Sequence, residues 1–206
     1  MIFYRSKKEN FLMIKRYTRP EMGQVWTDEN RYRKWLEVEL AVCEAWNQLG
    51  EIPSESLNEI KQKANLSIER IEEIESVVKH DVIAFLTSVA EYVGDNSRYI
   101  HLGLTSYDVV DTALSLLIRE ALLKIQTELQ NLKATLKQEA IRYKNTPIVG
   151  RTHGVHAEPI TFGVKLLVWY EEIKRHLLRL SHALDVISVG RICGSVGTFI
   201  HLDPKV

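Results

Sequence analysis

The chain has 206 residues, of which 45% are hydrophobic and 26% charged, so it is long enough to bury a real core and is not a disordered sequence. Its 27 Lys and Arg residues balance 27 Asp and Glu residues, and the formal net charge is zero. This balance argues against a general nucleic-acid or membrane-surface binder, because both need a concentrated positive field. With only ten Gly and five Pro, the composition favours helix over a turn-rich β-sandwich.

The N-terminal region and the cysteines indicate a cytoplasmic protein. Residues 1–10 lack the apolar segment and cleavage site of a signal peptide, and no stretch approaches the roughly 18 uncharged apolar residues of a membrane span. Cys43 and Cys193 are too few and too far apart for a disulfide framework or a zinc site, so we expect two buried small hydrophobes. Because Met13 is a second candidate start, residues 1–12 are expected to be an extension or tail outside the fold.

Apolar residues at intervals of three and four predict a series of helices in the first half of the chain. The first is amphipathic, with Thr27 or Asp28 as its cap and Gly50 after its last turn. Ser67 is the predicted cap of the third. The predicted ranges are 28–49, 53–64, 67–78 and 82–93, with a bend at 79–81.

Two longer helical patterns follow, over about 106–143 and about 160–188. A helix of about 37 residues would be roughly 55 Å long, which exceeds a compact domain of this size. In a pair of antiparallel helices, each helix covers one apolar stripe of the other but leaves apolar residues on both flanks exposed. We therefore expect a larger bundle or an oligomer. No alternating strand pattern or Asn-Gly hairpin is evident, and the Gly-rich stretch 194–206 ends without a final element.

Three polar segments lie at breaks between the predicted helices, and each contains histidine: 79–81, 101–108 and 150–159. Histidine titrates near neutral pH, so it can donate and accept a proton in one reaction cycle. Hydroxyl groups and backbone amides at a helix N-terminus suit a carboxylate or phosphate, and Thr105 and Ser106 occupy such a place. The simpler interpretation is that these residues and Asp108 only cap the helix.

The histidines do not by themselves predict a metal site. His153 and His156 are three residues apart, but no third ligand stands at a fixed spacing, and no metal is expected. A structural role is favoured for His176 and His182 within the long helix, and His201 is undecided. No Gly-x-Gly-x-x-Gly turn or Gly-Lys-Ser/Thr phosphate loop is present, so no cofactor is expected either.

Four motifs in order resemble one enzyme family. They are Arg16-Tyr17-x-Arg19-Pro20-Glu21-Met22, Lys79-His80-Asp81-Val82, His101-x-Gly103-Leu104-Thr105-Ser106-x-Asp108, and Gly150-Arg151-Thr152-His153-Gly154-Val155-His156-Ala157-Glu158-Pro159. Together they are similar to the adenylosuccinate lyase family of the fumarase/aspartase superfamily, from about Met13 to the end of the chain. A muconate-type cycloisomerase, which shares the Thr-Ser-x-Asp-Val segment, is the nearest alternative.

The resemblance implies an all-α subunit with two domains. A small helical domain is expected over 13–104, and the long antiparallel helices over 105–206 are expected to be the first, incomplete part of a central helical bundle. The family assembles as a homotetramer and takes a small-molecule purine nucleotide as substrate. It eliminates fumarate from adenylosuccinate to give AMP, and from succinylaminoimidazole carboxamide ribotide, in purine nucleotide biosynthesis. Neither nucleic acid nor a membrane is an expected partner.

The resemblance also assigns roles to residues. His153 is the acid that protonates the departing nitrogen, and His80 supports it or the substrate. Thr105 and Ser106 would hold the succinyl carboxylate, and Arg16 and Tyr17 the phosphate. The other residues implied to line the substrate site, with less defined roles, are Lys79, Asp81, His101 and Thr152.

Two features depart from the family pattern. Tyr107 is bulky where the family has a small or polar residue. The family's catalytic base, a serine in a mobile Ser-Ser-x-Met-Pro-x-Lys-x-Asn loop, has no counterpart in this sequence. The chain is therefore expected to supply the binding and acid part of a composite site and not to turn over substrate alone. A non-catalytic helical assembly module is the competing hypothesis.

Overall fold

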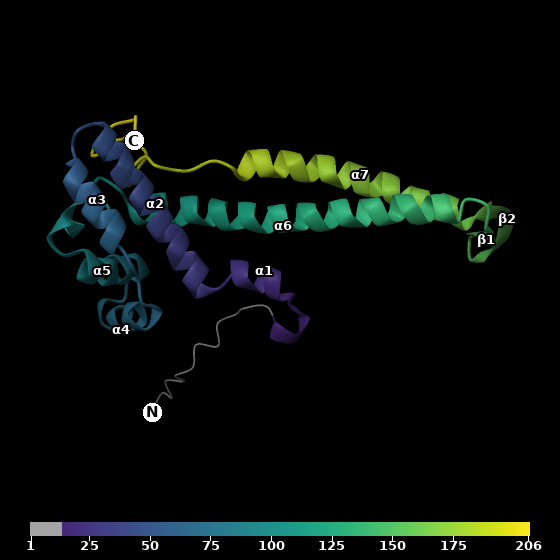
Figure 1. Cartoon of the computed structure of the whole chain (residues 1–206), viewed down its shortest axis with the longest axis horizontal. Helices are drawn as coiled ribbons and strands as arrows, with labels where there is room; N and C mark the ends of the chain where they lie inside the picture. Colours follow the sequence, from purple (N-terminus) through teal and green to yellow (C-terminus); the bar gives the residue numbers. More distant parts are fainter. Residues whose placement is uncertain (1–13) are drawn as a thin grey trace, which may run out of the picture. The chain divides into compact units, whose positions relative to one another are not determined.

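The computed structural model describes residues 14–206, so the expected tail at 1–12 lies outside the described residues. The described part is mainly helical, with seven α-helices and one small sheet, which confirms the all-α class. None of its helices combines the length and the apolar character that a membrane span needs. The elements, in chain order, are η1 (Lys15–Tyr17), α1 (Pro20–Val25), α2 (Asp28–Gln48), α3 (Ser54–Lys63), α4 (Ile68–Val78), α5 (Asp81–Val93), η2 (Gly94–Tyr99), α6 (Ser106–Arg142), β1 (Pro147–Thr152), β2 (Val155–Thr161) and α7 (Phe162–Ile187) (Figure 1).

The six predicted helices are confirmed to within two residues at each end. The predicted caps are also present, because the Thr27 hydroxyl accepts a hydrogen bond from the Asn30 amide at 3.2 Å and the Ser67 hydroxyl accepts one from the Arg70 amide at 3.3 Å. Helix α1 and the 3-10 helix η2 were not predicted. Both are only six residues long and too short to show a helical period.

Two compact units make up the chain. Unit 1 comprises the residues up to Ile118 together with Val189–Val206, and unit 2 comprises Arg119–Ser188. Helix α6 therefore contributes its first turns to unit 1 and the rest of its length to unit 2. The expected domain boundary between 104 and 105 stays a prediction.

The core of unit 1 is built around three aromatic rings from α2 and α5. Trp35 meets Phe85 edge-on with ring centroids 5.5 Å apart, and Tyr32 stacks on the same ring at 6.0 Å. Such pairs contribute roughly 0.5–1.5 kcal/mol each beyond the area that they bury. Val109 and Ala113 from the start of α6 are fully buried in the same cluster, so the core fixes the N-terminus of the longest helix.

A second cluster in unit 1 holds the C-terminal segment. Leu202 is buried against Val42, Cys43 and Trp46 of α2. The Gly-rich stretch has no helix or strand, as expected, yet it is packed in place. The prediction of two buried cysteines is confirmed for Cys43, which is fully buried. It is wrong for Cys193 in this segment, which is only half-buried.

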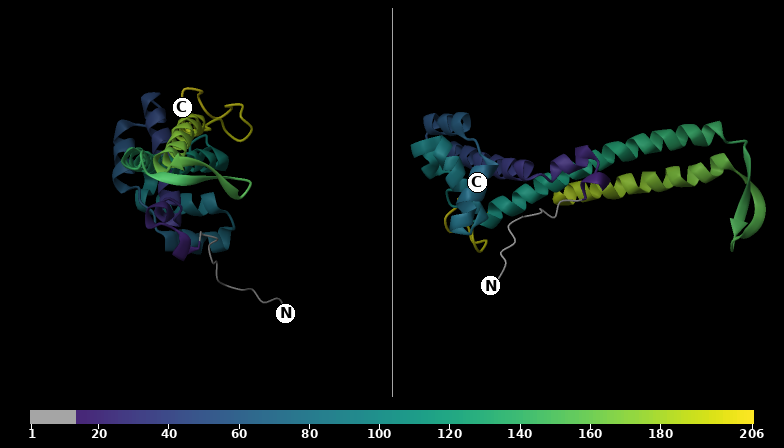
Figure 2. Two further views of the ribbon diagram at one scale, coloured as in Figure 1. Left: turned by 90° about the vertical axis from the view of Figure 1, so that its right-hand side faces the viewer. Right: turned by 90° about the horizontal axis from the view of Figure 1, so that it is seen from below.

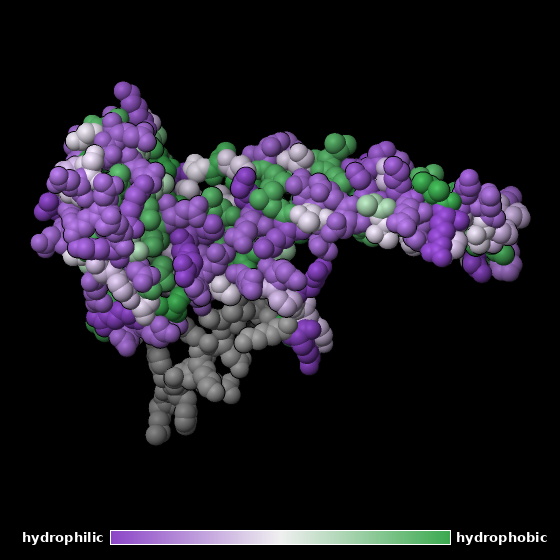
Figure 3. Space-filling model, in the orientation of Figure 1, coloured by the Kyte–Doolittle hydropathy of each residue, from purple (hydrophilic) through white to green (hydrophobic). Residues whose placement is uncertain are grey.

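In unit 2 the second part of α6 and the whole of α7 lie side by side and antiparallel, joined through the hairpin β1–β2 (Figure 2). Their contact has a small hydrophobic core of three buried residues, Leu136, Ala140 and Leu166. Gly163 lets the start of α7 approach the end of α6, because an added Cβ would overlap the Ala140 carbonyl oxygen. Apolar side chains that this contact does not cover remain exposed, among them Ile125, Leu132, Val164, Leu167, Val168 and Trp169. Hydrophobic patches are visible along α6 and α7 in Figure 3.

The sequence predicts no strands, and this prediction is wrong. Strands β1 and β2 pair antiparallel from Pro147↔Thr161 to Thr152↔Val155, with an irregularity between Val149 and Arg151. The two residues between the strands, His153 and Gly154, have φ values of 52° and 77°. Two consecutive positive φ values define a type I′ turn, in which histidine occupies the position more often taken by asparagine. The hairpin therefore lacks the Asn-Gly signal that is typical of such turns.

Candidate functional site

Three of the predicted site residues have left-handed backbone conformation. Lys79, His101 and His153 have φ values of 58°, 65° and 52°, and among residues 14–206 only one other non-glycine residue, Phe199, has a positive φ. The left-handed conformation costs a non-glycine residue roughly 1–2 kcal/mol. Each of the three polar segments therefore contains one residue with strained backbone. Such residues are held in place by the surrounding structure, and they are found most often at functional sites.

The first segment is the junction between α4 and α5. Lys79 ends α4 in the left-handed conformation and turns the chain, and His80 is the N-cap of α5, where its Nδ1 accepts from the Ile83 amide at 3.4 Å. Asp81 accepts from the adjacent Val82 amide at 2.8 Å. All three predicted site residues are exposed, so their side chains are available to a ligand.

The second segment is fixed by a buried carboxylate that the sequence did not single out. Glu39 of α2 is completely buried, and it accepts from the His101 backbone amide at 2.8 Å while its other oxygen lies 2.6 Å from the His101 Nδ1. A signal for it did exist, because Glu39 stands four residues after Trp35 and four before Cys43 on the apolar face of the helix. An acidic residue in that place needs a partner.

Thr105 and Ser106 lie at the N-terminus of the 37-residue helix α6. The Thr105 amide donates to the Asp108 carboxylate at 2.9 Å, which is one half of a capping box. Within residues 14–206 the hydroxyls of Thr105 and Ser106 make no hydrogen bond, and both residues are half-buried. These two hydroxyls, at the positive end of a long helix dipole, are suited to an anionic group.

Asp108 itself is structural. Its carboxylate is fully buried and, besides the Thr105 amide, accepts from the amides of Cys193 and Gly194 at 3.1 and 3.0 Å and from Arg191 Nη1 at 3.3 Å. It therefore fastens residues 191–194 to the first turn of α6. The interpretation of Asp108 as a cap is correct but covers only part of its role.

Arg16 and Tyr17 form a separate exposed pair in η1. The Arg16 guanidinium lies over the Tyr17 ring, 4.8 Å from its centroid, and Tyr17 is 73% exposed. A cation on an aromatic face is held in position with its outer edge still able to bind an anion.

Thr152 and His153 lie in unit 2, at the tip of the hairpin, and both side chains are exposed. The other predicted site residues belong to unit 1. The structure thus arranges these residues in four local groups, 16–17, 79–81, 101–106 and 152–153. Among the described residues of unit 1, no hydrogen bond or ion pair joins the groups 16–17, 79–81 and 101–106 to one another.

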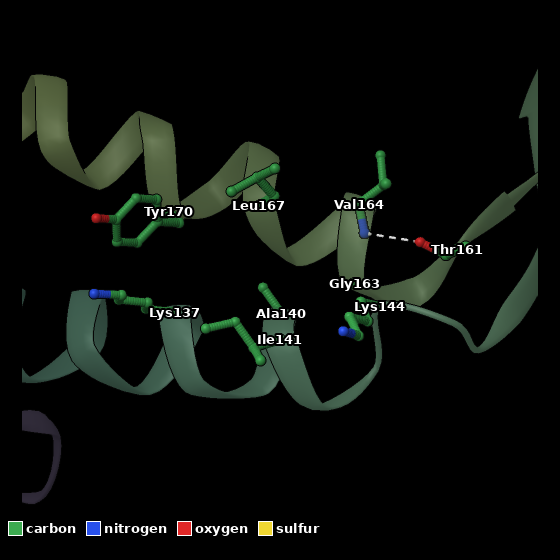
Figure 4. A pocket seen from close by; sticks show the side chains of 9 residues that line it. All are labelled: Lys137, Ala140, Ile141, Lys144, Thr161, Gly163, Val164, Leu167 and Tyr170. Atoms are coloured by element: carbon green, nitrogen blue, oxygen red, sulfur yellow. Dashed lines mark hydrogen bonds between the residues drawn. The ribbon is translucent and has the colours of Figure 1, made fainter.

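A pocket in unit 2 differs from these polar groups in its apolar lining. It has a volume of about 370 Å³, lies between α6 and α7, and is mainly apolar, with the Lys137 and Lys144 amines at its edge (Figure 4). Thr161 caps α7 at one end of it by accepting from the Val164 amide at 3.2 Å. None of the predicted site residues lines it.

Burial, followed by the negative charge of Glu39, raises the pKa of the Cys43 thiol to about 12, so this cysteine is a neutral core residue at physiological pH. Among the described residues, no three His, Cys, Asp or Glu side chains are placed to hold a metal ion together.

The chain is similar in sequence to a known enzyme family. A family model described as "Lyase" matches residues 15–206. The adenylosuccinate lyase of Aquifex aeolicus (strain VF5) is 51% identical over 197 residues, covering 94% of this chain and 45% of that protein. The adenylosuccinate lyase of Staphylococcus saprophyticus subsp. saprophyticus is 49% identical over 194 residues, with the same two coverages. The chain thus spans less than half the length of these curated relatives.

Solved structures give the same fold at lower identity. A fumarate lyase from Mesorhizobium sp. BNC1 matches with a TM-score of 0.83 and 28% identity, covering 89% of this chain and 44% of that one. The 3-carboxy-cis,cis-muconate lactonizing enzyme from Pseudomonas putida matches with a TM-score of 0.82 and 29% identity, covering 90% and 44%.

Proposed function

Because the chain belongs to the lyase family, whose model matches residues 15–206, we propose that it forms part of an adenylosuccinate lyase. The observation that carries the proposal is the identity of about half of all residues to two adenylosuccinate lyases along 94% of the chain. The solved lyase and muconate enzymes share only 28–29%. The proposed reaction releases fumarate from adenylosuccinate to give AMP, and from succinylaminoimidazole carboxamide ribotide.

The proposed chemistry is cleavage of a C–N bond by β-elimination. A base removes the proton next to the succinyl carboxylate, the electron pair passes through the carbanion to form the fumarate double bond, and the C–N bond breaks. An acid protonates the departing nitrogen. His153 suits the acid role, because it stands exposed at the tip of a two-residue turn that fixes its backbone. His80, at the exposed cap of α5, would support the acid or the substrate.

The substrate carries carboxylates and a phosphate, and the chain offers a place for each. We assign the succinyl carboxylate to the unpaired hydroxyls of Thr105 and Ser106 at the N-terminus of α6, where negative charge is stabilised. The phosphate is assigned to Arg16, held over Tyr17. The remaining residues proposed to line the substrate site are Lys79, Asp81, His101 and Thr152.

The base is proposed to come from outside this sequence, since no Ser-Ser-x-Met-Pro-x-Lys-x-Asn segment occurs in it and the chain covers 45% of its curated relatives. The proposed assembly is a homotetramer in the cytoplasm. Apolar side chains exposed along α6 and α7, such as Ile125, Leu132 and Val168, support association with further helices.

Fumarate release tests the proposal. The corresponding 197 residues of the Aquifex aeolicus enzyme would be replaced by those of this chain, and fumarate formation from adenylosuccinate measured. We expect an active chimera and an inactive 206-residue chain. Replacement His153→Asn keeps a residue that tolerates a type I′ turn but cannot donate a proton as an acid, so activity should fall by roughly 10²–10⁴-fold.

His182→Asn in the same chimera is the matched control, because this histidine is exposed on α7 and has no proposed role. Full activity of the His153→Asn chimera would refute the acid assignment, and fumarate release by the 206-residue chain alone would refute the composite site.

A muconate-type cycloisomerase is the second candidate, favoured by the structural match to the Pseudomonas putida enzyme. Turnover of 3-carboxy-cis,cis-muconate but not adenylosuccinate by the chimera would favour it. A non-catalytic helical module would instead show self-association in size-exclusion chromatography with neither activity.

A further inference from the structure

Glu39 is a buried acidic residue whose side-chain hydrogen bonds, among the described residues, all go to one other residue. It lies in the middle of α2, is 0% exposed, and uses both carboxylate oxygens on His101. One oxygen accepts from the backbone amide at 2.8 Å, and the other lies 2.6 Å from Nδ1 of the ring. The arrangement fixes the left-handed backbone of His101 and the direction of its imidazole together.

The chemistry of the pair decides where the ring proton is. When Glu39 is ionised, its carboxylate only accepts hydrogen bonds, and the Nδ1 that faces it then carries the hydrogen. In the neutral ring, Nε2 then holds the free lone pair. Among residues 14–206, Nε2 makes no hydrogen bond and is not one of the buried atoms without a partner, and the side chain is 21% exposed. The free nitrogen therefore reaches the surface.

The backbone of this turn has other supports. Trp46 Nε1 donates to the Leu102 carbonyl at 3.0 Å, and the Cys43 thiol lies 3.6 Å from the Tyr99 carbonyl oxygen. Gly103 packs directly on the His201 carbonyl, where a Cβ would overlap. Several contacts thus place the chain from Tyr99 to Gly103, whereas within the described residues Glu39 alone contacts the ring nitrogens of His101 by a hydrogen bond.

We propose that Glu39 is a positioning residue for His101, which holds the proton on Nδ1 and presents Nε2 to the substrate. The functional part of this inference rests on the proposed substrate contact of His101, whereas the tautomer does not. Presented in this way, Nε2 accepts a hydrogen bond from a substrate N–H or O–H group when the ring is neutral, and donates one to a substrate oxygen when the ring is protonated.

The test is the side-chain ¹⁵N spectrum of the histidines in the 206-residue chain, recorded at alkaline pH where imidazoles are neutral. A His101→Gln variant assigns the His101 signals by their loss. We expect His101 to be the Nδ1–H tautomer, while the exposed His176 and His182 of α7 serve as internal references. Finding the Nε2–H tautomer in the wild-type chain would overturn the proposal without any need for a Glu39 variant.

The Glu39→Gln variant tests whether Glu39 determines the tautomer of His101. An amide offers one acceptor oxygen, so when this oxygen binds the His101 backbone amide, the NH₂ group faces Nδ1 and the proton must move to Nε2. We expect the major tautomer to switch. Glu44→Gln removes a charge from the same helix at an exposed ion pair with Lys61 and should leave the His101 spectrum unchanged. An unchanged His101 ring in Glu39→Gln would count against the proposal.

The fumarate assay separates the two proposals. A chimera that releases no fumarate would count against the proposed function alone, because the tautomer of His101 is measured without substrate. In an active chimera, Glu39→Gln should lower kcat/KM by at least tenfold and Glu44→Gln should not, and an unaffected Glu39→Gln chimera would refute the positioning role in the reaction.

Discussion

Thr112 and Arg191, 79 residues apart, bond to each other in both directions. The Thr112 hydroxyl donates to the Arg191 carbonyl oxygen at 3.1 Å and accepts from the Arg191 amide at 2.9 Å. One turn earlier on α6, Asp108 accepts from two more backbone amides of the same segment, those of Cys193 and Gly194. Residues 191–194 belong to no helix or strand. Side chains on the first turns of α6 supply hydrogen-bond partners to their backbone instead.

Thr112→Val should loosen this segment. Valine keeps the shape of threonine but leaves the Arg191 amide without an acceptor, at a cost of roughly 1–3 kcal/mol. We expect faster hydrogen–deuterium exchange of residues 191–194, measured by mass spectrometry, with the amides of α4 and α5 unchanged. Thr112→Ser retains the hydroxyl and should exchange like the wild type. Equal exchange in the valine and serine variants would show that the hydroxyl does not hold the segment.

Asp108→Asn should destabilise unit 1 more strongly. The carboxylate is fully buried and accepts four hydrogen bonds, whereas an asparagine amide turns one of its two acceptor atoms into a donor that faces N–H groups. A loss of about 2–4 kcal/mol in the free energy of unfolding is expected from urea titration. Glu44→Gln, also a loss of one carboxylate charge but at an exposed position, should change the free energy by less than about 1 kcal/mol.

Gly103→Ala and Gly50→Ala form a matched pair. Both glycines have positive φ, 76° and 85°, so alanine at either position costs roughly 1–2 kcal/mol of backbone strain. Only at Gly103 would the new methyl group overlap another atom, the His201 carbonyl oxygen. We expect a loss of at least about 3 kcal/mol for Gly103→Ala in urea unfolding. Equal losses for the two variants would contradict the packing of the C-terminal segment on this turn.

The buried Cys43 thiol predicts a pH dependence of stability. Its pKa is about 12 in the folded chain against an ordinary value near 9, so between these two pH values the unfolded chain loses a proton that the folded chain keeps. Folding stability should therefore fall as pH rises through this window, by up to about 1.4 kcal/mol per pH unit from this one group. Well below pH 9 the thiol is protonated in both states, and the group then contributes no pH dependence.

Cys43→Ala removes this contribution. The difference in unfolding free energy between the wild type and the variant, measured by urea titration from pH 8 to pH 10.5, cancels the other groups that titrate there. The wild type should lose stability relative to the variant as the pH rises. A difference that stays constant over this range would show that the thiol is not held neutral by burial.

The helices were predictable from the sequence because each is long enough to show a period and has a recognisable beginning. Thr27 and Ser67 are ordinary caps, and the apolar residues behind them repeat every three or four positions. The hairpin was not predictable in the same way, since its turn uses His153 and most of its strand residues are exposed on both faces. Strands without a buried face have no alternation to detect.

Motifs in the sequence predicted the candidate site residues, but their contacts could not be predicted from it. Motif resemblance pointed to His101, yet its partner Glu39 stands 62 positions earlier in the chain, and only the packing of α2 brings the two together. The sequence around Asp108 likewise predicts only a local cap, whereas in the fold residues 191–194 lie against its carboxylate. Long-range hydrogen bonds of this kind leave no periodic signature.

The left-handed backbones of Lys79, His101 and His153 have a consequence for protein engineering. Glycine adopts these φ values without penalty, so each of the three positions is one where replacement by glycine relieves strain. Selection for thermal stability alone would therefore favour loss of the side chains on which the proposed chemistry depends. A stabilised version of this chain is best sought with these three positions held constant.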